Sequence, residues 1–283
     1  MATLFVVSTP IGNLGDVTYR AIEVLGRVRR ILAEDTRRTS ILLRHYGIAT
    51  PRVSAHAHNE QMRAAQLVEW LEGGDDVALV SDAGTPLLSD PGARLVRAAL
   101  DAGHAVVPVP GASALLAALV ASGLQPEPFT YYGFPPRSGR ARLELLRAAS
   151  AARHVSVFYE GPGRVARLLA DLASMCGPGR EVAVARELTK LHESIFRGTL
   201  VAAATNYAGQ RVRGEVVVVL SGAGPDVIVD DGGVAAAGVV RGLLKEGMKP
   251  SAAAREAARR LAIPRSEAYR LALQEADSGK EQH

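Results

Sequence analysis

The chain has 283 residues, 48% of them hydrophobic, and carries a formal net charge of +4, with basic side chains that are nearly all Arg. This length allows two or three domains with sizeable cores, while no apolar run reaches the ~20 residues of a membrane span and the N-terminus lacks a secretory signal pattern. A single cysteine, Cys176, excludes an internal disulfide and a multi-cysteine zinc site, so we expect a cytoplasmic protein with no bound metal.

Residues 1–113 alternate apolar runs with helical patterns joined by short links. Such alternation predicts an α/β domain with a mostly parallel sheet. The expected strands are 3–8, 30–34, 52–55, 77–81 and 105–109, and the expected helices are 17–27, 37–46, 60–73, 91–102 and one opening at Ser113.

Three of these strands end in loops rich in Gly, Pro and other small residues. They are T-P-I-G-N-L-G-D at residues 9–16, S-D-A-G-T-P-L-L-S-D-P-G at 81–92 and P-G-A-S at 110–113. In open α/β sheets, ligands bind outside the carboxyl ends of the strands, and Gly84 would let a ligand approach the backbone. The three loops therefore predict one small-molecule pocket, with ordinary strand-to-helix connections as the alternative.

The loop chemistry restricts the ligand. Neither the G-x-G-x-x-G spacing of a dinucleotide site nor a P-loop occurs, which disfavours a phosphate-cradling loop. The carboxylates of Asp16, Asp82 and Asp90 favour a ligand with ribose hydroxyls or positive charge.

The pattern changes after Gly123 to β-rich runs joined by short loops. Short loops favour antiparallel or mixed pairing, so we expect a second α/β domain over residues 114–224. Its expected strands are 129–133, 155–159, 182–186, 195–199 and 215–220, with helices at 139–151, 163–175 and 200–207.

The tail is helical. A Gly- and Asp-containing linker at 222–233 precedes helical patterns at 234–246, 251–261 and 265–276. The last two are joined at 262–264 and look like a helix-turn-helix, so residues 234–283 are predicted to form a small helical domain.

Basic residues gather in three stretches of the chain. Residues 20–52 hold eight Arg against three acids, 137–167 hold seven Arg against two, and 241–270 hold eight Lys or Arg against three. Such islands suit a polyanion such as RNA, and solvated helix faces are the alternative.

Seven segments taken together resemble a known family. They are residues 9–16, A-E-D-T-R at 33–37, residues 81–92, P-V-P-G-A-S-A at 108–114, G-F-P-P at 133–136, F-Y-E at 158–160 and A-R-E-L-T-K at 185–190. Over residues 3–222 the chain resembles the tetrapyrrole-methylase superfamily of class III S-adenosylmethionine (SAM) methyltransferases. Within it, the chain is most similar to the bacterial ribosomal RNA cytidine 2′-O-methyltransferases. The first loop departs from the G-x-G-P-G-D type of the cobalamin and sirohaem members, which disfavours a tetrapyrrole substrate.

The resemblance implies two α/β domains with an inter-domain cleft that holds SAM, a homodimer, and a small C-terminal helical domain that binds RNA. It implies methylation of a cytidine 2′-oxygen in 16S rRNA of the small ribosomal subunit. The alternatives are a methylase of a small tetrapyrrole and a non-catalytic RNA-binding protein that retains the fold. The residues implied to line the donor site are Pro10, Asp82, Ala83, Gly84, Thr85, Pro86, Ala112, Ser113, Tyr159, Ala185, Gly214 and Glu215.

A ribose hydroxyl is a poor nucleophile, so a positioned base would help. The candidates are polar residues at the ends of strands. One segment, 34–37, is expected beside the first loop, and a second segment spans 186–190. The alternative is that these residues form structural ion pairs with one another. The candidates are Glu34, Asp35, Glu187 and Lys190, with His192 nearby, and the base is left unassigned. His56 and His58 could pair on a metal, but no third ligand is placed.

Arginine matches phosphate geometry with two parallel hydrogen bonds, which suits an RNA backbone. The candidate RNA contacts are Arg37 and Arg186 in the α/β domains and Lys245, Lys249, Arg255, Arg259, Arg260 and Arg265 in the tail.

Overall fold

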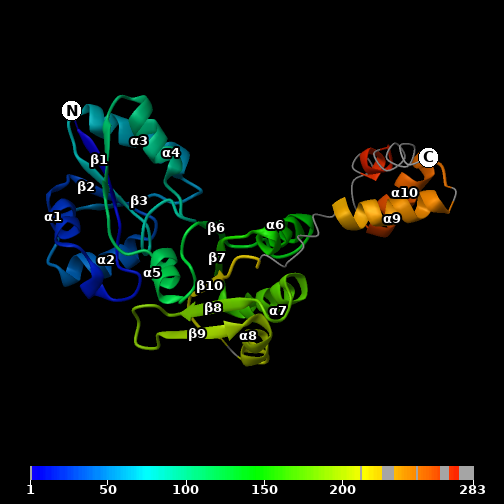
Figure 1. Cartoon of the computed structure of the whole chain (residues 1–283). Coiled ribbons are helices and arrows are strands. Elements are labelled where there is room, and N and C mark those ends of the chain that lie inside the picture. Colours follow the sequence, from blue (N-terminus) through cyan, green and yellow to red (C-terminus); the bar gives the residue numbers. More distant parts are fainter. Residues whose placement is uncertain (1, 211, 225–232, 247, 262–267, 274–283) are drawn as a thin grey trace. The chain divides into compact units, whose positions relative to one another are not determined.

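The computed structural model describes the chain except residues 1, 211, 225–232, 247, 262–267 and 274–283; of 233–237, 245 and 261 it describes the backbone alone. The chain forms two compact units, Met1–Gly222 and Ala223–His283. The first unit contains two five-stranded sheets, and the second is helical (Figure 1). No helix among the described residues is long and apolar enough to cross a membrane.

The first sheet is fully parallel, with strand order β3-β2-β4-β1-β5. Helices α1 and α2 pack on one face, and α3 and α4 pack together on the other (Figure 1). Both faces are therefore covered, which is why β4 is apolar and buried at every position. The elements are β1 (Thr3–Val7), α1 (Tyr19–Arg27), β2 (Arg30–Ala33), α2 (Thr36–His45), β3 (Arg52–Ser54), α3 (Glu60–Glu72), β4 (Val77–Val80), α4 (Ala93–Asp101) and β5 (Ala105–Val109).

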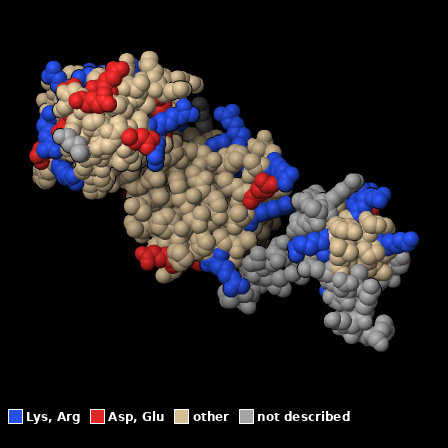
Figure 2. Space-filling view, turned by 90° about the horizontal axis from the view of Figure 1, so that it is seen from above, with Lys and Arg blue, Asp and Glu red and all other residues tan. Residues whose placement is uncertain are grey.

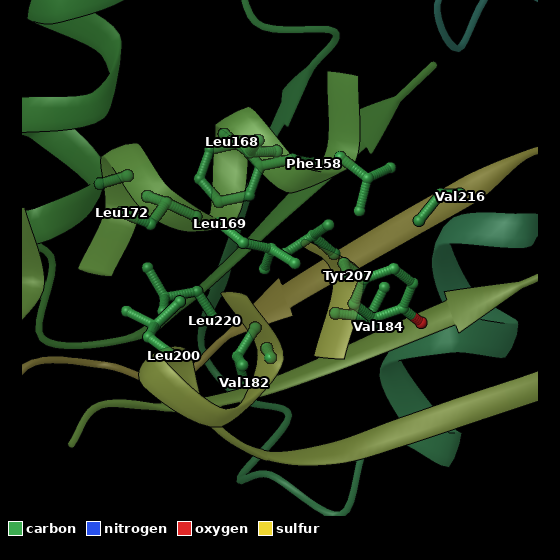
Figure 3. Close-up of a cluster of buried hydrophobic side chains, with 14 of the residues drawn as sticks. Phe158, Leu168, Leu169, Leu172, Val182, Val184, Leu200, Tyr207, Val216 and Leu220 are labelled. Atoms are coloured by element: carbon green, nitrogen blue, oxygen red, sulfur yellow. The ribbon is translucent and has the colours of Figure 1, made fainter. Parts of the chain in front are cut away.

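The second sheet is mixed, with strand order β6-β7-β10-β8-β9, and β6 pairs with β7 in parallel while the other pairs are antiparallel. Helix α5 covers one face, and α7 and α8 pack with α6 on the other, where Phe158 and Tyr207 point into the cluster drawn in Figure 3. The elements are α5 (Ala114–Ala121), β6 (Phe129–Gly133), α6 (Arg140–Ala151), β7 (Val155–Glu160), α7 (Val165–Cys176), β8 (Glu181–Arg186), β9 (Ser194–Thr199), α8 (Leu200–Tyr207) and β10 (Val216–Leu220).

The second unit holds α9 (Gly233–Lys245), α10 (Pro250–Leu261) and a helical stretch at 268–273. Small and aliphatic side chains close its core, with Val240 and Leu243 packed against Ala254 and Ala257. The predicted turn at 262–264 and the start and end of the predicted helix 265–276 lie outside the described residues, as does most of the linker at 222–233.

The fold prediction is confirmed, with local differences at element ends. Helix α1 begins two residues late because Val17 is extended and Thr18 caps the helix, accepting a hydrogen bond from the Ala21 N–H at 3.1 Å. Helix α4 cannot include Gly92, whose φ of 126° lies outside the helical region. A short 3₁₀ turn, η1 (Leu14–Asp16), was not predicted, and a second, η2 (Pro162–Arg164), precedes α7.

Candidate functional site

The three small-residue loops meet at one edge of the first sheet, as predicted, because β4, β1 and β5 are neighbours. Thr9 and Gly84 exchange backbone hydrogen bonds of 2.9 and 3.0 Å, which join the loops after β1 and β4. Gly84 has a φ of +78°, a conformation that favours glycine. The Thr85 hydroxyl donates to the Ala112 carbonyl at 3.2 Å and so ties in the loop after β5.

A cavity of about 260 Å³ opens beside these loops and is closed by residues of the second sheet. Eight of its lining residues were predicted for the donor or catalytic site: Glu34, Asp82, Ala83, Gly84, Thr85, Ser113, Tyr159 and Glu215. We call this the donor cavity.

The donor cavity is rich in carboxylates. Burial raises the pKa of Glu34, and the nearby charges of Asp82 and Asp90 raise it further. Burial likewise raises the pKa of Asp90. One oxygen of Glu34, Oε2, is buried without a hydrogen-bond partner among the described residues. Such crowding of negative charge suits a cationic ligand.

Aromatic rings form the opposite wall. The Tyr159 ring lies 5.1 Å from that of Tyr131 and 5.5 Å from that of Phe134. The Tyr159 hydroxyl accepts a hydrogen bond from the Leu115 N–H at 3.0 Å, and burial raises its pKa to about 12. Tyr159 therefore stays neutral, and its ring can contact a cation or a flat base.

The loop after β4 is strained where it passes these rings. Leu87 and Ser89 have φ values of 76° and 70°, and the Ser89 hydroxyl lies 2.7 Å from the Tyr131 hydroxyl. Non-glycine residues at positive φ cost roughly 1–3 kcal/mol each and cluster at functional sites. Leu88, between these two residues, lines the cavity.

A second charged cluster joins the ends of β8 and β10 in the second sheet. The Lys190 ammonium donates to Glu187 at 2.9 Å and to Glu215 at 3.2 Å, and Glu187 also accepts from the Glu215 N–H at 3.1 Å. The hydrogen bond from Lys190 lowers the pKa of Glu187. Burial alone would lower the pKa of Lys190, but the two carboxylates outweigh it and raise that pKa. A Cβ on Gly12 would overlap Lys190, and one on Gly214 would overlap the Glu187 carboxylate.

The segment after β2 lies beside the loop after β4, not beside the first loop as expected, because β4 stands between β1 and β2. The Asp35 N–H donates to the Asp82 carboxylate at 2.9 Å. The Asp35 side chain accepts two hydrogen bonds from the Arg37 guanidinium, and these bonds lower its pKa to about 2. Arg38, which was not singled out, lies 3.6 Å from Asp82 and lines the donor cavity.

A second cavity of about 230 Å³ shares Ile11, Arg38, Asp82 and Ala83 with the donor cavity. Pro10 and Lys190, predicted for the site, line this second cavity instead. The remaining predicted residues line neither cavity; they are Pro86, Ala112, Ala185, Gly214, Asp35, Glu187, Arg37 and Arg186.

Sequence reasoning did not assign several residues that line the donor cavity. Asp90 was expected as a loop carboxylate that favours a cationic or ribose-bearing ligand, and it lines the cavity. Ser89 lies in the same quoted loop and Phe134 in the quoted G-F-P-P segment, so a signal was present for these two as well. Ile11, Arg38, Leu88 and Ala114 carry no comparable signal, because only the tertiary arrangement brings them to the cavity.

In the second unit, Arg259 and Arg260 both pair with Glu256, whereas Lys249 and Arg255 are exposed. The Lys245 side chain and Arg265 lie outside the described residues. On the face that Figure 2 presents, basic side chains stand in separate groups around a broad uncharged area of the first unit. Among the described residues, no three His, Cys, Asp or Glu side chains gather as a possible metal site.

A sheet pair of this kind, with glycine loops facing a cavity between the sheets, is the architecture of one family of methylases. The chain belongs to the tetrapyrrole (corrin/porphyrin) methylase family, whose model matches residues 3–204. It is 43% identical to "Ribosomal RNA small subunit methyltransferase I" of Synechocystis sp. over 98% of this chain and all of that relative. It is 45% identical to the protein of the same name from Xylella fastidiosa strain Temecula1, over 94% of this chain and 97% of the relative.

A solved structure with the same fold is uroporphyrin-III C-methyl transferase from Thermus thermophilus, complexed with S-adenyl homocysteine. The TM-score is 0.56 at 19% identity, over 78% of this chain and 97% of that one.

Proposed function

We propose that this protein transfers a methyl group from SAM to the 2′-oxygen of a cytidine in 16S rRNA of the small ribosomal subunit. The observation that carries the proposal is an acidic cavity at the meeting point of the three loops, in a chain that matches ribosomal RNA small subunit methyltransferases from end to end. The same relatives make a small tetrapyrrole the less favoured substrate.

The donor cavity fits the donor's chemistry. A sulfonium and an α-amino group are both cationic, and the cavity gathers Glu34, Asp82 and Asp90. Tyr159 and Phe134 offer ring faces to the sulfonium or the adenine. Gly84 leaves room for close backbone approach, and the Thr85 and Ser113 hydroxyls can bond the ribose or carboxylate.

When bound, the donor supplies an electrophilic methyl carbon whose bonding pair returns to sulfur as the O–C bond forms. The protein's work is to hold the two reacting atoms in line and to accept the hydroxyl proton. No metal is needed, because the leaving group departs as a neutral thioether.

Glu34 is the best of the four candidate bases. Asp35 is held by Arg37 with a pKa of about 2, and Glu187 is held by Lys190 with a lowered pKa, so both are weak bases. Lys190 has a raised pKa and stays protonated. Glu34 lines the donor cavity and has a raised pKa, so it is the candidate best able to take a proton there.

The remaining parts of the proposal concern partners. We assign residues 1–113 and 114–224 to two α/β domains that share the donor site, and 234–283 to RNA binding, with Lys249 and Arg255 exposed for phosphate. Arg37 is exposed and Arg186 reaches the Ser194 hydroxyl at 3.1 Å, so both remain secondary candidates for RNA contacts. A cytoplasmic homodimer completes the proposal.

The test is methylation of purified small subunits with labelled SAM, followed by mapping of 2′-O-methyl groups on 16S rRNA from cells with and without this chain. A methyl group at one cytidine that disappears without the chain supports the proposal. Label that enters a precorrin but not the subunit points to a tetrapyrrole methylase. A binding protein that only retains the fold would keep its RNA affinity and its cellular effect in an Asp82→Ala, Gly84→Val variant, and this outcome would also reject the proposal.

A further inference from the structure

The second cavity differs from the donor cavity in charge, although the two share a wall. Four carboxylates and one guanidinium line the donor cavity, those of Glu34, Asp82, Asp90, Glu215 and Arg38. The second cavity is lined by one carboxylate, Asp82, and by two cations, Arg38 and Lys190. The lining of the second cavity is therefore less acidic than that of the donor cavity, which makes it the better place for a phosphate, and its two cations also pair with Asp82, Glu187 and Glu215.

The rest of the second cavity is apolar. Pro10, Ile11, Leu14, Ile41 and Leu42 line it. Ile41 is 61% exposed although it is a large aliphatic residue at the cavity edge. An apolar floor beside cations is the combination that holds an unstacked base and its phosphates.

An unsatisfied polar atom also lies in this cavity wall. Thr9 is only 6% exposed, and its hydroxyl Oγ1 is buried with no hydrogen-bond partner among the described residues. Buried hydroxyls are normally bonded, so this unpartnered one is an unexplained feature of the wall of the second cavity. Gly12, in the same loop, lacks the Cβ that would collide with the aliphatic part of the Lys190 side chain, so the loop packs closely against that side chain.

We propose that the second cavity binds the target nucleotide of the RNA, with the base on its apolar floor and adjoining phosphates on Lys190 and Arg38. This inference rests on the proposed function and names the acceptor's place within it. The shared wall at Asp82 and Ala83 then brings the ribose next to the donor cavity. Glu34, whose pKa responds to both Asp82 and Arg38, lies close to that wall.

Two variants separate the expected contacts. Lys190→Met is made in a Glu187→Gln, Glu215→Gln background, where no carboxylate loses its partner, and is compared with that background. It removes a phosphate contact, so we expect the KM for small subunits to rise about tenfold and the slope of log affinity against log salt to fall by about one. Ile41→Ala removes apolar contact from an exposed position, so we expect about a fivefold rise in KM with an unchanged salt slope. Arg44→Gln, on the same helix and outside both cavities, controls for general attraction of RNA and should change less than either.

The substrate is small subunits from cells lacking this chain, with saturating labelled SAM, and S-adenosylhomocysteine binding is measured by calorimetry. Wild-type methylation tests the proposed function separately from this inference. Subunit KM rising in both variants, with S-adenosylhomocysteine affinity within twofold, supports the inference. Unchanged KM overturns it, as does an equal loss of S-adenosylhomocysteine affinity. If light scattering shows a lower oligomer mass for Ile41→Ala than for the wild type, a second copy of the chain covers the cavity, and the inference is overturned.

Discussion

Gly214→Ala tests whether Glu187 is held in place at the ends of β8 and β10, as its hydrogen bonds indicate. Gly214 has a φ of +81°, and a Cβ there would overlap the Glu187 carboxylate. Gly209 is the matched control, because its φ is +70° and nothing lies within 4 Å of its Cβ position. Both substitutions therefore carry the backbone cost, and only Gly214→Ala carries the clash.

The magnitudes separate the two variants. A left-handed non-glycine residue costs roughly 1–2 kcal/mol, partly offset by reduced freedom of the unfolded chain, so Gly209→Ala should cost about 1 kcal/mol. Displacing Glu187 also breaks its bond from the Glu215 N–H, worth roughly 1.5–3 kcal/mol, and a partly exposed ion pair with Lys190, worth up to ~1 kcal/mol. Gly214→Ala should therefore cost about 3–5 kcal/mol.

Urea unfolding followed by circular dichroism measures both costs. In a Glu187→Ala background the obstruction is absent, so Gly214→Ala should then cost no more than Gly209→Ala. Equal unfolding free energies for Gly214→Ala and Gly209→Ala in the wild-type background would show that Glu187 is not held as described.

Three further predictions concern activity and stability. Glu34→Gln should lower kcat by about 10²–10⁴ with unchanged S-adenosylhomocysteine affinity, whereas Asp35→Asn should change kcat less than threefold; comparable losses in both would argue against Glu34 as the base. Because the pKa of Glu34 is raised in the folded protein, the protonated side chain stabilises the fold at low pH, and this contribution is lost as the pH rises through that pKa. Glu34→Gln should therefore raise the free energy of unfolding at pH 7 but not at pH 4. Deletion of residues 234–283 should weaken RNA binding in filter assays while calorimetry shows unchanged donor affinity, and lost donor affinity would contradict the separation into two units.

Much of the architecture could be predicted because the apolar periods are clear. Strand β4 is apolar throughout since both faces of the first sheet are covered, and β10 is buried at every position for the same reason. The three glycine loops could be placed at one edge because strands that alternate with helices are parallel and end together. Strand order could not be predicted, which is why the segment after β2 was expected one strand away from its position.

The site was harder to predict because its chemistry depends on contacts between distant segments. Nothing local to Arg38 distinguishes it from Arg37, yet Arg38 lines both cavities while Arg37 turns back to Asp35. Likewise, the sequence alone makes Glu187 and Lys190 equally good candidates for the base. Their mutual hydrogen bond, seen only in the structure, makes both of them poor proton acceptors.

Asp82 contributes to the raised pKa of Glu34. The Asp82 carboxylate accepts the Asp35 N–H and faces Arg38, so it links the ends of β2 and β4 and is held in place. Its fixed charge raises the pKa of Glu34, which burial has already raised. A backbone hydrogen bond at Asp82 and the charge of Arg38 lower this pKa only in part, so Glu34 keeps the basicity that a ribose hydroxyl requires. The raised pKa and the unpaired oxygen of Glu34 are what the proposed role of this residue as the base requires.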